Sequence, residues 1–448
     1  MPALVWFRSD LRTEDNTALH AACSGSSDGV IGLFVISPDE WRRHDVAAVR
    51  VEFILRTLAP LSARLAGLNI PLKFATAESA ADVPSLVVAL AQRHGCGSIH
   101  FNREYEVNEA QRDSAVLSLS ASAGIRAIGY DDQTVVPPDR LRTGEGRYYT
   151  VFSPYKRAWL KSLAAEGIPP VLSAPGPQAR IAVEPDDVPT SVSGFRSGVS
   201  ADRWPAGERA AMDRLHAFAG TAILEYKDRR DYPGVEGTSS LSPYLAIGAI
   251  SARQCLAAAI GASPEKRSPL EGGPAGVVHW ISELVWREFY IAVMVGFPRV
   301  CKHRAFKPAA DRIRWKDNDD HVERWKAGKT GVPIVDAGMR QLLSEGWMHN
   351  RVRMITAMYF SKNLFQDWRI GERHFMRHLV DGTLASNNGG WQWSASTGTD
   401  AAPYFRIFNP ISQSERFDPE GSYIRRGVPE LGAIAGEAIH DPGRLPAL

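Results

Sequence analysis

Apolar positions in the first 130 residues follow two different periodicities. One is the spacing of a helix with a single buried face, shown between residues 54 and 65 by Ile54, Leu58, Leu61 and Leu65. The other is that of short, continuously apolar runs typical of buried strands. Alternating strands and helices predict an α/β domain with a parallel, Rossmann-like sheet that is covered on both faces. The short apolar runs predict five strands: Ala3–Phe7, Val30–Ile36, Ile70–Phe74, Ser98–Phe101 and Ile125–Ile128.

The pattern changes after this α/β region. Residues 131–205 are expected to form an interdomain linker, because proline, glycine, serine and alanine punctuate the chain from Pro169 to Pro205. Helical periodicity then dominates to about residue 380, which predicts an all-α domain over residues 206–448. Two domains agree with a length of 448 residues, which is too long for one ordinary core.

Charge and composition narrow the function only slightly. Lys and Arg number 52 against 50 Asp and Glu, so a nucleic-acid partner would require basic residues gathered on one face. The N-terminal segment lacks a secretory apolar stretch, and no run of 18 apolar residues predicts a membrane span. Four scattered cysteines without a CxxC pair indicate a reducing compartment, and we expect a cytoplasmic protein.

Several short patterns do not carry chemistry. The turn Arg8–Arg12 after the first strand lacks G-x-G-x-x-G, so dinucleotide binding in the Rossmann manner is not expected. Gly328-Lys329-Thr330 lacks the upstream glycine of a phosphate loop, since position 323 is Glu323. His374 and His378 have no third ligand, and the acidic residues 317–320 lack the pattern of a calcium loop. We therefore expect no metal.

Tryptophan is unusually concentrated in the helical region. Core packing explains any single indole, but a cluster can also stack on bases or carry electrons to a cofactor. Eight of the 12 tryptophans fall in one stretch: Trp280, Trp286, Trp315, Trp325, Trp347, Trp368, Trp391 and Trp393.

Three further segments combine polar and small residues. Thr238–Ser242 places hydroxyl groups before an apolar helical run, which suits either phosphate binding or simple N-capping. On a helix, Asn350, Arg353 and Met354 share one face, a choice that suits a planar, partly polar ligand. Asp381–Trp393 joins two asparagines, two glycines and Trp-x-Trp, so the backbone can approach a ligand while amides reach ring heteroatoms.

With these segments in view, the chain resembles the photolyase/cryptochrome family, and within it the class I cyclobutane pyrimidine dimer photolyases. The resemblance covers nearly the whole chain, through LVWFRSDLR, EGTSSLSPYLAIGAIS, ELVWREFY, GWMHNRVRMITA and DGTLASNNGGWQWSASTGTDAAPYFRIFNP. It implies light-driven repair of cyclobutane dimers in UV-damaged DNA by a monomer that uses reduced FAD. A cryptochrome photoreceptor and a (6-4) or single-strand-specific photolyase are the alternatives.

The resemblance also implies roles for single residues. Asn387 would face the reactive nitrogen of the flavin, while Trp391, Trp368 and Trp315 would carry electrons from the surface to the flavin. FAD would be held by Tyr226, Thr238, Ser239, Ser240, Leu241, Ser242, Trp280, Glu283, Asn350, Arg353, Asp381, Thr383 and Asn387. The flipped dimer would be held by Arg230, Glu283, Trp286, Asn350, Arg351, Met354 and Trp393.

Two further expectations follow from the resemblance. The (6-4) photolyases carry histidines where this chain has Asn350 and Met354, and neither residue can donate the proton that this repair requires. An antenna chromophore, methenyltetrahydrofolate ahead of a deazaflavin or an empty site, would contact His44, Asn108, Glu109 and Lys302.

The chain departs from the family at Thr383, where a second Asp is usual. The basic stretch 299–316 is either part of the DNA face or a solvated surface.

Overall fold

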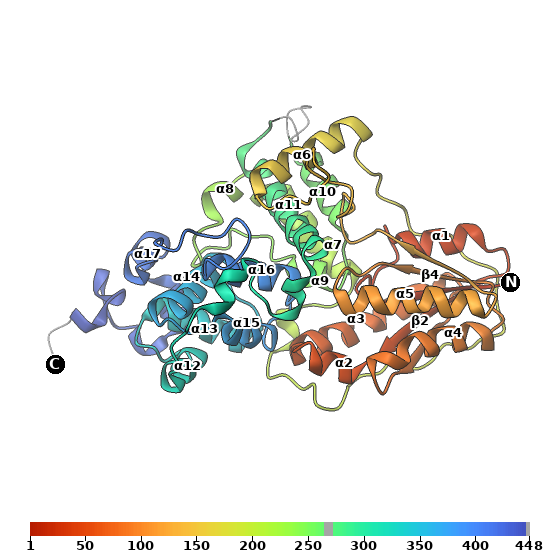
Figure 1. The fold of residues 1–448 in the computed structure, drawn as a ribbon, viewed down its shortest axis with the longest axis horizontal. Coiled ribbons are helices and arrows are strands. Elements are labelled where there is room, and N and C mark those ends of the chain that lie inside the picture. Colours follow the sequence, from red (N-terminus) through yellow and green to blue (C-terminus); the bar gives the residue numbers. More distant parts are fainter. Residues whose placement is uncertain (264–271, 445–448) are drawn as a thin grey trace.

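The computed structural model describes residues 1–263 and 272–444. A parallel sheet at one end of the molecule is joined to a helical domain at the other, and α17 lies at the end opposite to the N-terminus (Figure 1). The strands are β1 (Ala3–Phe7), β2 (Val30–Ile36), β3 (Leu72–Thr76), β4 (Ser98–Asn102) and β5 (Arg126–Tyr130). The helices of this part are α1 (Thr17–Gly25), α2 (Pro38–Arg43), α3 (Ala48–Gly67), α4 (Val83–Arg93) and α5 (Val107–Ser122).

The sheet has the order β3-β2-β1-β4-β5, and every pair of neighbours is parallel. Side chains of β1 alternate between two cores: Val5 and Phe7 pack with α1 and α3, whereas Leu4 and Trp6 pack with α4 and α5. All residues of β1 and β2 are buried, as expected for a parallel sheet that has helices on both faces. The predicted sheet is confirmed; β3 and β5 start two and one residues later than expected.

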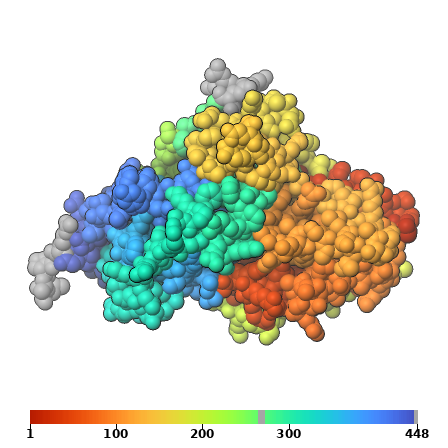
Figure 2. Space-filling view, viewed as in Figure 1, coloured from red at the N-terminus to blue at the C-terminus, as the bar shows by residue number. Residues whose placement is uncertain are grey.

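The region 131–205, predicted as a linker, contains a helix of 15 residues, α6 (Phe152–Glu166). Tyr155, Trp159 and Leu163 form its buried face, and this face packs against α11 (Ala275–Gly296). The first half of the connector is therefore a packed element, which the prediction missed because residues 152–166 show only a short apolar stripe. Figure 2 shows the surface of this segment, in yellow, continuous with that of the helical domain.

The helical domain is built around α11. Its other helices are α7 (Glu208–Ala217), α8 (Tyr226–Arg229), α9 (Ser242–Ala246), α10 (Ala252–Gly261), α12 (Asp319–Lys326), α13 (Pro333–Glu345), α14 (Asn350–Met358), α15 (Trp368–Met376), α16 (Leu384–Ser394), α17 (Pro410–Phe417) and α18 (Ser422–Gly427). The side chain of Asn318 caps α12, whose first turn holds Asp319 and Asp320, so the acidic cluster is a helix start. None of the helices in the described residues combines the length and the apolar character that crossing a membrane requires.

Four buried charged side chains join the two domains. Arg253 of α10 donates to Asp15 (Nε to Oδ2, 2.9 Å) and to Asp132 (Nη2 to Oδ1, 2.7 Å), and Arg12 pairs with Asp132 as well. Gly248 allows the close approach, because a Cβ there would lie 2.0 Å from the backbone oxygen of Ser9. The turn after β1, where a Rossmann fold holds its dinucleotide, is thus occupied by the helical domain.

Candidate functional site

The loop Thr238–Ser242 presents an array of free donors. Among the described residues, none of its five backbone N–H groups donates to another part of the chain. Ser240 adopts a left-handed conformation (φ 49°), and the indole Nε1 of Trp280 donates to Ser239 Oγ at 3.3 Å. Free N–H groups in succession form an anion-binding concavity, so the loop fits a diphosphate better than it fits simple capping.

Two helices add polar groups beside this loop. A single nitrogen of Arg353 (α14), Nη2, donates to both carboxylate oxygens of Asp381, to Oδ1 at 3.1 Å and to Oδ2 at 2.9 Å. Asn387 of α16 is buried, and its Nδ2 donates to the backbone oxygen of Glu372 at 2.9 Å. Thr383 caps no N–H group with its side chain and lies on the wall of a cavity described below. The free N–H groups of the loop, the ion pair of Arg353 with Asp381 and the amide of Asn387 together match the polar parts of a flavin dinucleotide.

The three tryptophans of the expected electron path lie on connected elements. Trp391 and Trp368 are buried, and Trp315 is half-buried. Trp391 packs on α15 at Gly371, where a Cβ would lie 2.1 Å from its ring. Trp368 begins the same helix, and a backbone bridge between Lys316 and Gln366 places Trp315 beside that start.

The indole nitrogens distinguish these three residues from their neighbour Trp325. None of the Nε1 groups of Trp315, Trp368 and Trp391 has a hydrogen-bond partner within the described chain. Trp325 packs against Trp391 with ring centroids 5.8 Å apart, but its Nε1 donates to Thr356 O at 3.2 Å. The three indoles thus lie on connected elements from α16 to the half-buried Trp315, and none of them makes a hydrogen bond within the described residues.

The expected lesion residues meet at a cluster of charges. Arg230 pairs with Glu283, and Arg351 Nη2 lies 2.8 Å from Asp231 Oδ1. Arg230 Nε is 3.8 Å from the same Asp231 oxygen, so one carboxylate holds both arginines together. Burial lowers the pKa of Arg230, but Glu283, Tyr226 and Asp231 together outweigh burial, so the net pKa is raised. The two guanidinium groups lie together and are suitably placed for phosphates.

The apolar members of this group are half-buried. Trp286, Met354 and Trp393 each keep part of their surface accessible, and Asn350 is exposed at the start of α14. The side chain of Asn350 makes no hydrogen bond within the described residues. These positions can accept a flat, partly apolar ligand without rearrangement of the core.

A second site lies between the domains, in a cavity of about 400 Å³. All four expected antenna residues line it: His44, Asn108, Glu109 and Lys302. His44 Nδ1 lies 3.2 Å from Glu109 Oε1, and Asn108 Nδ2 lies 3.1 Å from His44 Nε2. Thr383 lies on the wall of the same cavity, as do Glu372 and Ser386, so this cavity reaches α16.

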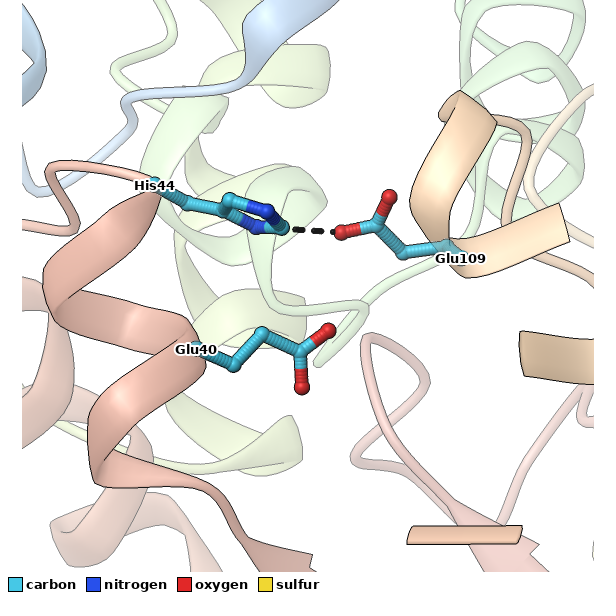
Figure 3. Close-up of side chains that lie close together, drawn as sticks. All are labelled: Glu40, His44 and Glu109. Atoms are coloured by element: carbon cyan, nitrogen blue, oxygen red, sulfur yellow. Dashed lines mark ion pairs between the residues drawn. The ribbon is translucent and has the colours of Figure 1, made fainter. Parts of the chain in front are cut away.

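Glu40, His44 and Glu109 also form a possible metal-ligand set, since one ligand atom of each lies within 4.8 Å of the others. In Figure 3, His44 at the end of α2 points toward Glu109 of α5, with Glu40 below. The Glu109 carboxylate raises the pKa of His44, and Arg112 lies 3.2 Å from Glu40. A raised pKa disfavours the neutral imidazole that a metal ion needs, and the Glu40 carboxylate is already paired, so this set makes a poor cation site.

Sequence reasoning missed several residues at the lesion side. Phe152 of α6 stacks on Trp286, and Asp400 accepts a hydrogen bond from the backbone N–H of Phe152 at 3.0 Å. Tyr404 and Phe405 are 82% and 73% exposed, in a loop that follows Trp393. The sequence PYFRIFNP, with three aromatic residues between two prolines, could have indicated an exposed binding loop.

The basic stretch is mostly free of partners. Arg299 pairs with Asp311 at 2.8 Å, and Lys307 donates to the backbone of Ser396. No ion pair involves the other basic residues of this stretch within the described chain, and these residues are exposed: Lys302, Arg304, Arg312, Arg314 and Lys316. The exposed charges of this stretch therefore remain available to a polyanion.

Comparisons with known proteins agree with this geometry. Residues 3–176 match the model for DNA photolyase, and residues 280–448 match the FAD binding domain of DNA photolyase. The chain is 46% identical to the deoxyribodipyrimidine photo-lyase of Salmonella typhimurium, over 98% of this chain and 92% of the relative. For the enzyme of that name from Escherichia coli, the identity is 45%, over 98% and 91% of the two chains.

Solved structures give the same result. A class III photolyase from Agrobacterium tumefaciens has a TM-score of 0.88 at 34% identity, over 99% of this chain and 90% of that chain. A cryptochrome from Synechocystis has a TM-score of 0.84 at 27% identity, over 100% and 92% of the two chains. With its parallel sheet, its helical FAD-binding domain and these relatives, the protein belongs to the DNA photolyase family.

Proposed function

We propose that the protein splits cyclobutane pyrimidine dimers in DNA under near-UV or blue light. The position of α11 carries this proposal. Trp280 of this helix donates to Ser239 in the loop Thr238–Ser242. Glu283 and Trp286 follow within two turns of the same helix, and Glu283 pairs with Arg230 in the cluster of charges described above. This spacing on one helix supports a cofactor and damaged bases bound side by side, as direct electron transfer requires.

When bound, reduced FAD would supply the one-electron chemistry that splits the dimer, so the chain's own residues bind and orient the flipped bases. Arg230 and Arg351 clamp the phosphates on either side of the flipped bases. Trp286 and Trp393 form flat walls for those bases, and Glu283 accepts hydrogen bonds from their edges. Because Arg230 pairs with Glu283, this carboxylate can orient the guanidinium group of Arg230 and still accept from the bases through its second oxygen.

The absence of a proton donor favours this lesion over the (6-4) product. Asn350 and Met354 cannot donate a proton at neutral pH. Their neighbour His349 is buried, and burial lowers its pKa to about 4. A neutral imidazole at this position cannot act as the acid that the (6-4) reaction requires.

Three further assignments accompany the proposal. Asn387 beside the flavin adds no charge, which favours repair over cryptochrome signalling. The cavity with His44, Asn108, Glu109 and Lys302 binds an antenna, and a reduced folate suits its carboxylate and amide groups. The protein acts as a cytoplasmic monomer.

The test is repair of an oligonucleotide with one thymine dimer by purified, FAD-reduced protein in light and in darkness. We expect splitting only in light. Trp286→Ala should weaken binding of the dimer by about 5- to 150-fold, since base stacking is worth ~1–3 kcal/mol. Trp325→Phe, a change at a tryptophan outside the pocket, is the matched control and should bind normally. A wild-type protein that leaves the dimer intact in light would contradict the proposal.

A further inference from the structure

Phe152, the first residue of the connector helix α6, lies flat against Trp286 of α11. The ring centroids are 3.6 Å apart and the planes differ by 4°, which makes this the closest aromatic pair in the described part of the chain. Both side chains are half-buried and pack on the rim of a core, where each also meets the edge of the buried Phe289 (ring centroids 5.9 Å and 5.6 Å away). The stack therefore keeps part of its surface accessible.

The stack ends a row of rings that begins at the flavin-facing helix. Tyr290 packs on α16 at Gly389, where a Cβ would lie 2.2 Å from its ring. Trp286 follows with its centroid 5.6 Å from that of Tyr290, and Phe152 closes the row. The indole of Trp286 is therefore stacked on the connector through Phe152, and it is contacted at its side by Tyr290, which itself packs on α16.

Hydrogen bonds fix the connector in this position. The N–H of Phe152 donates to Asp400 Oδ2 at 3.0 Å, and Thr399 Oγ1 donates to Thr150 O at 2.6 Å. Lys156, one turn further along α6, donates to Ser282 Oγ at 2.6 Å, next to Glu283. These bonds tie the connector to α11 and to the loop after Trp393, the two segments that form the walls of the pocket.

We propose that Phe152 is a positioning residue for lesion recognition: it supports one face of Trp286 so that the indole is held ready for the flipped dimer. The inference rests on the role of Trp286 proposed above. An indole at the rim of an open pocket has several rotamers, and ordering it on binding would reduce affinity. A stacked ring on one face and Tyr290 beside it leave the indole preordered.

The test compares Phe152→Leu with Phe152→Tyr in the full-length, FAD-loaded protein. Leucine keeps apolar volume but removes the ring, whereas tyrosine keeps the ring. Phe297→Leu is the matched control, because this half-buried phenylalanine next to α11 contacts Tyr148 and Phe306 instead. The measurements are the Kd for an oligonucleotide with one thymine dimer, the Kd for the undamaged oligonucleotide and the thermal unfolding midpoint.

Phe152→Leu should raise the Kd for the dimer by about three- to tenfold, while tyrosine restores it and the Kd for undamaged DNA is unchanged. An unchanged or lower Kd for the dimer, or an equal loss on undamaged DNA together with a lower unfolding midpoint, would overturn the inference. Wild-type protein without preference for the dimer would instead refute the proposed function. Trp286→Ala, measured alongside, distinguishes these two failures.

Discussion

The amide nitrogen of Asn387 donates to the backbone oxygen of Glu372 at 2.9 Å. A carbonyl oxygen can only accept, so the orientation of this amide is defined by its partner rather than by convention. The nitrogen is engaged and the oxygen is the group left for the pocket. An acceptor at that position favours a cofactor that presents an N–H, as the reduced flavin ring does.

Asn387→Asp should therefore cost stability and disfavour reduced FAD. A carboxylate cannot donate to Glu372, which leaves a buried carbonyl without its partner at a cost of about 1–3 kcal/mol. With FAD bound as proposed above, the carboxylate would also add negative charge beside the reduced ring. We expect a lower free energy of unfolding in urea and faster reoxidation of bound FAD in air.

Asn387→Leu separates the two effects, because leucine also abandons the Glu372 oxygen but carries no charge. It should lose stability as the aspartate does and reoxidise more slowly than the aspartate variant. Equal reoxidation rates in the two variants would show that the charge has no effect on the flavin.

The tryptophan path makes a prediction about photoreduction. Trp391→Phe should abolish light-driven reduction of oxidised FAD while leaving repair by chemically reduced protein intact, because a phenyl ring is far harder to oxidise than an indole. Trp325→Phe changes an equally buried neighbour that is hydrogen-bonded to Thr356 and should still photoreduce. Transient absorption of FAD after a light pulse measures both. Loss of repair in pre-reduced Trp391→Phe would contradict a role restricted to the path.

Two glycines near Trp391 should respond oppositely to alanine. Gly371→Ala places a Cβ 2.1 Å from the Trp391 ring, so the indole must move, at a cost of ~1–3 kcal/mol. A Cβ added at Gly390 of α16 would meet nothing within 4 Å, and alanine there should stabilise the helix by about 0.5–1 kcal/mol. Urea unfolding gives both values, and destabilisation by the two substitutions alike would show that the contact with Trp391 has no special weight.

The pair of His44 and Glu109 predicts a dependence on pH. Hydrogen bonding to Glu109 raises the pKa of His44 above its ordinary value of 6.5. The stabilisation is thus complete below about pH 6.5 and is lost as the pH rises through the raised pKa. The pair is partly exposed, so its contribution stays below about 1 kcal/mol.

The measurement is the unfolding midpoint of wild type and His44→Gln from pH 5 to pH 9. The difference between them should be largest at low pH and shrink toward high pH. His216→Gln, at an exposed histidine without an acidic partner among the described residues, serves as the control. A difference that grows with pH would contradict the ion pair.

The fold was largely accessible from sequence because its two periodicities are simple. Buried runs such as Val30–Ile36 identify strands, and the Ile54–Leu65 stripe identifies α3. Helix α6 was missed, since its buried residues Tyr155, Trp159 and Leu163 form a stripe only one residue wide. Such a stripe becomes meaningful only when the partner helix is known.

Some parts of the candidate site could be predicted from the sequence and others could not. Thr238–Ser242 and Asp381–Trp393 are contiguous, so their composition alone indicates a ligand. The stack of Phe152 on Trp286 joins residues far apart in the chain, and neither position is unusual by itself. The ion pair of Arg230 with Glu283 could not be predicted either. The family resemblance implies that each residue contacts the ligand, but it does not imply that the two contact each other.

The buried charges of Arg12, Asp15, Asp132 and Arg253 have a consequence for the use of light. Separation of the two domains would leave these buried charges without their partners. The free-energy cost of that loss is large, so the two domains stay fixed relative to each other. A chromophore in the cavity beside His44 would therefore keep a constant distance and angle to the flavin. Excitation transfer depends steeply on both quantities, and here folding, rather than any motion during turnover, would set its efficiency.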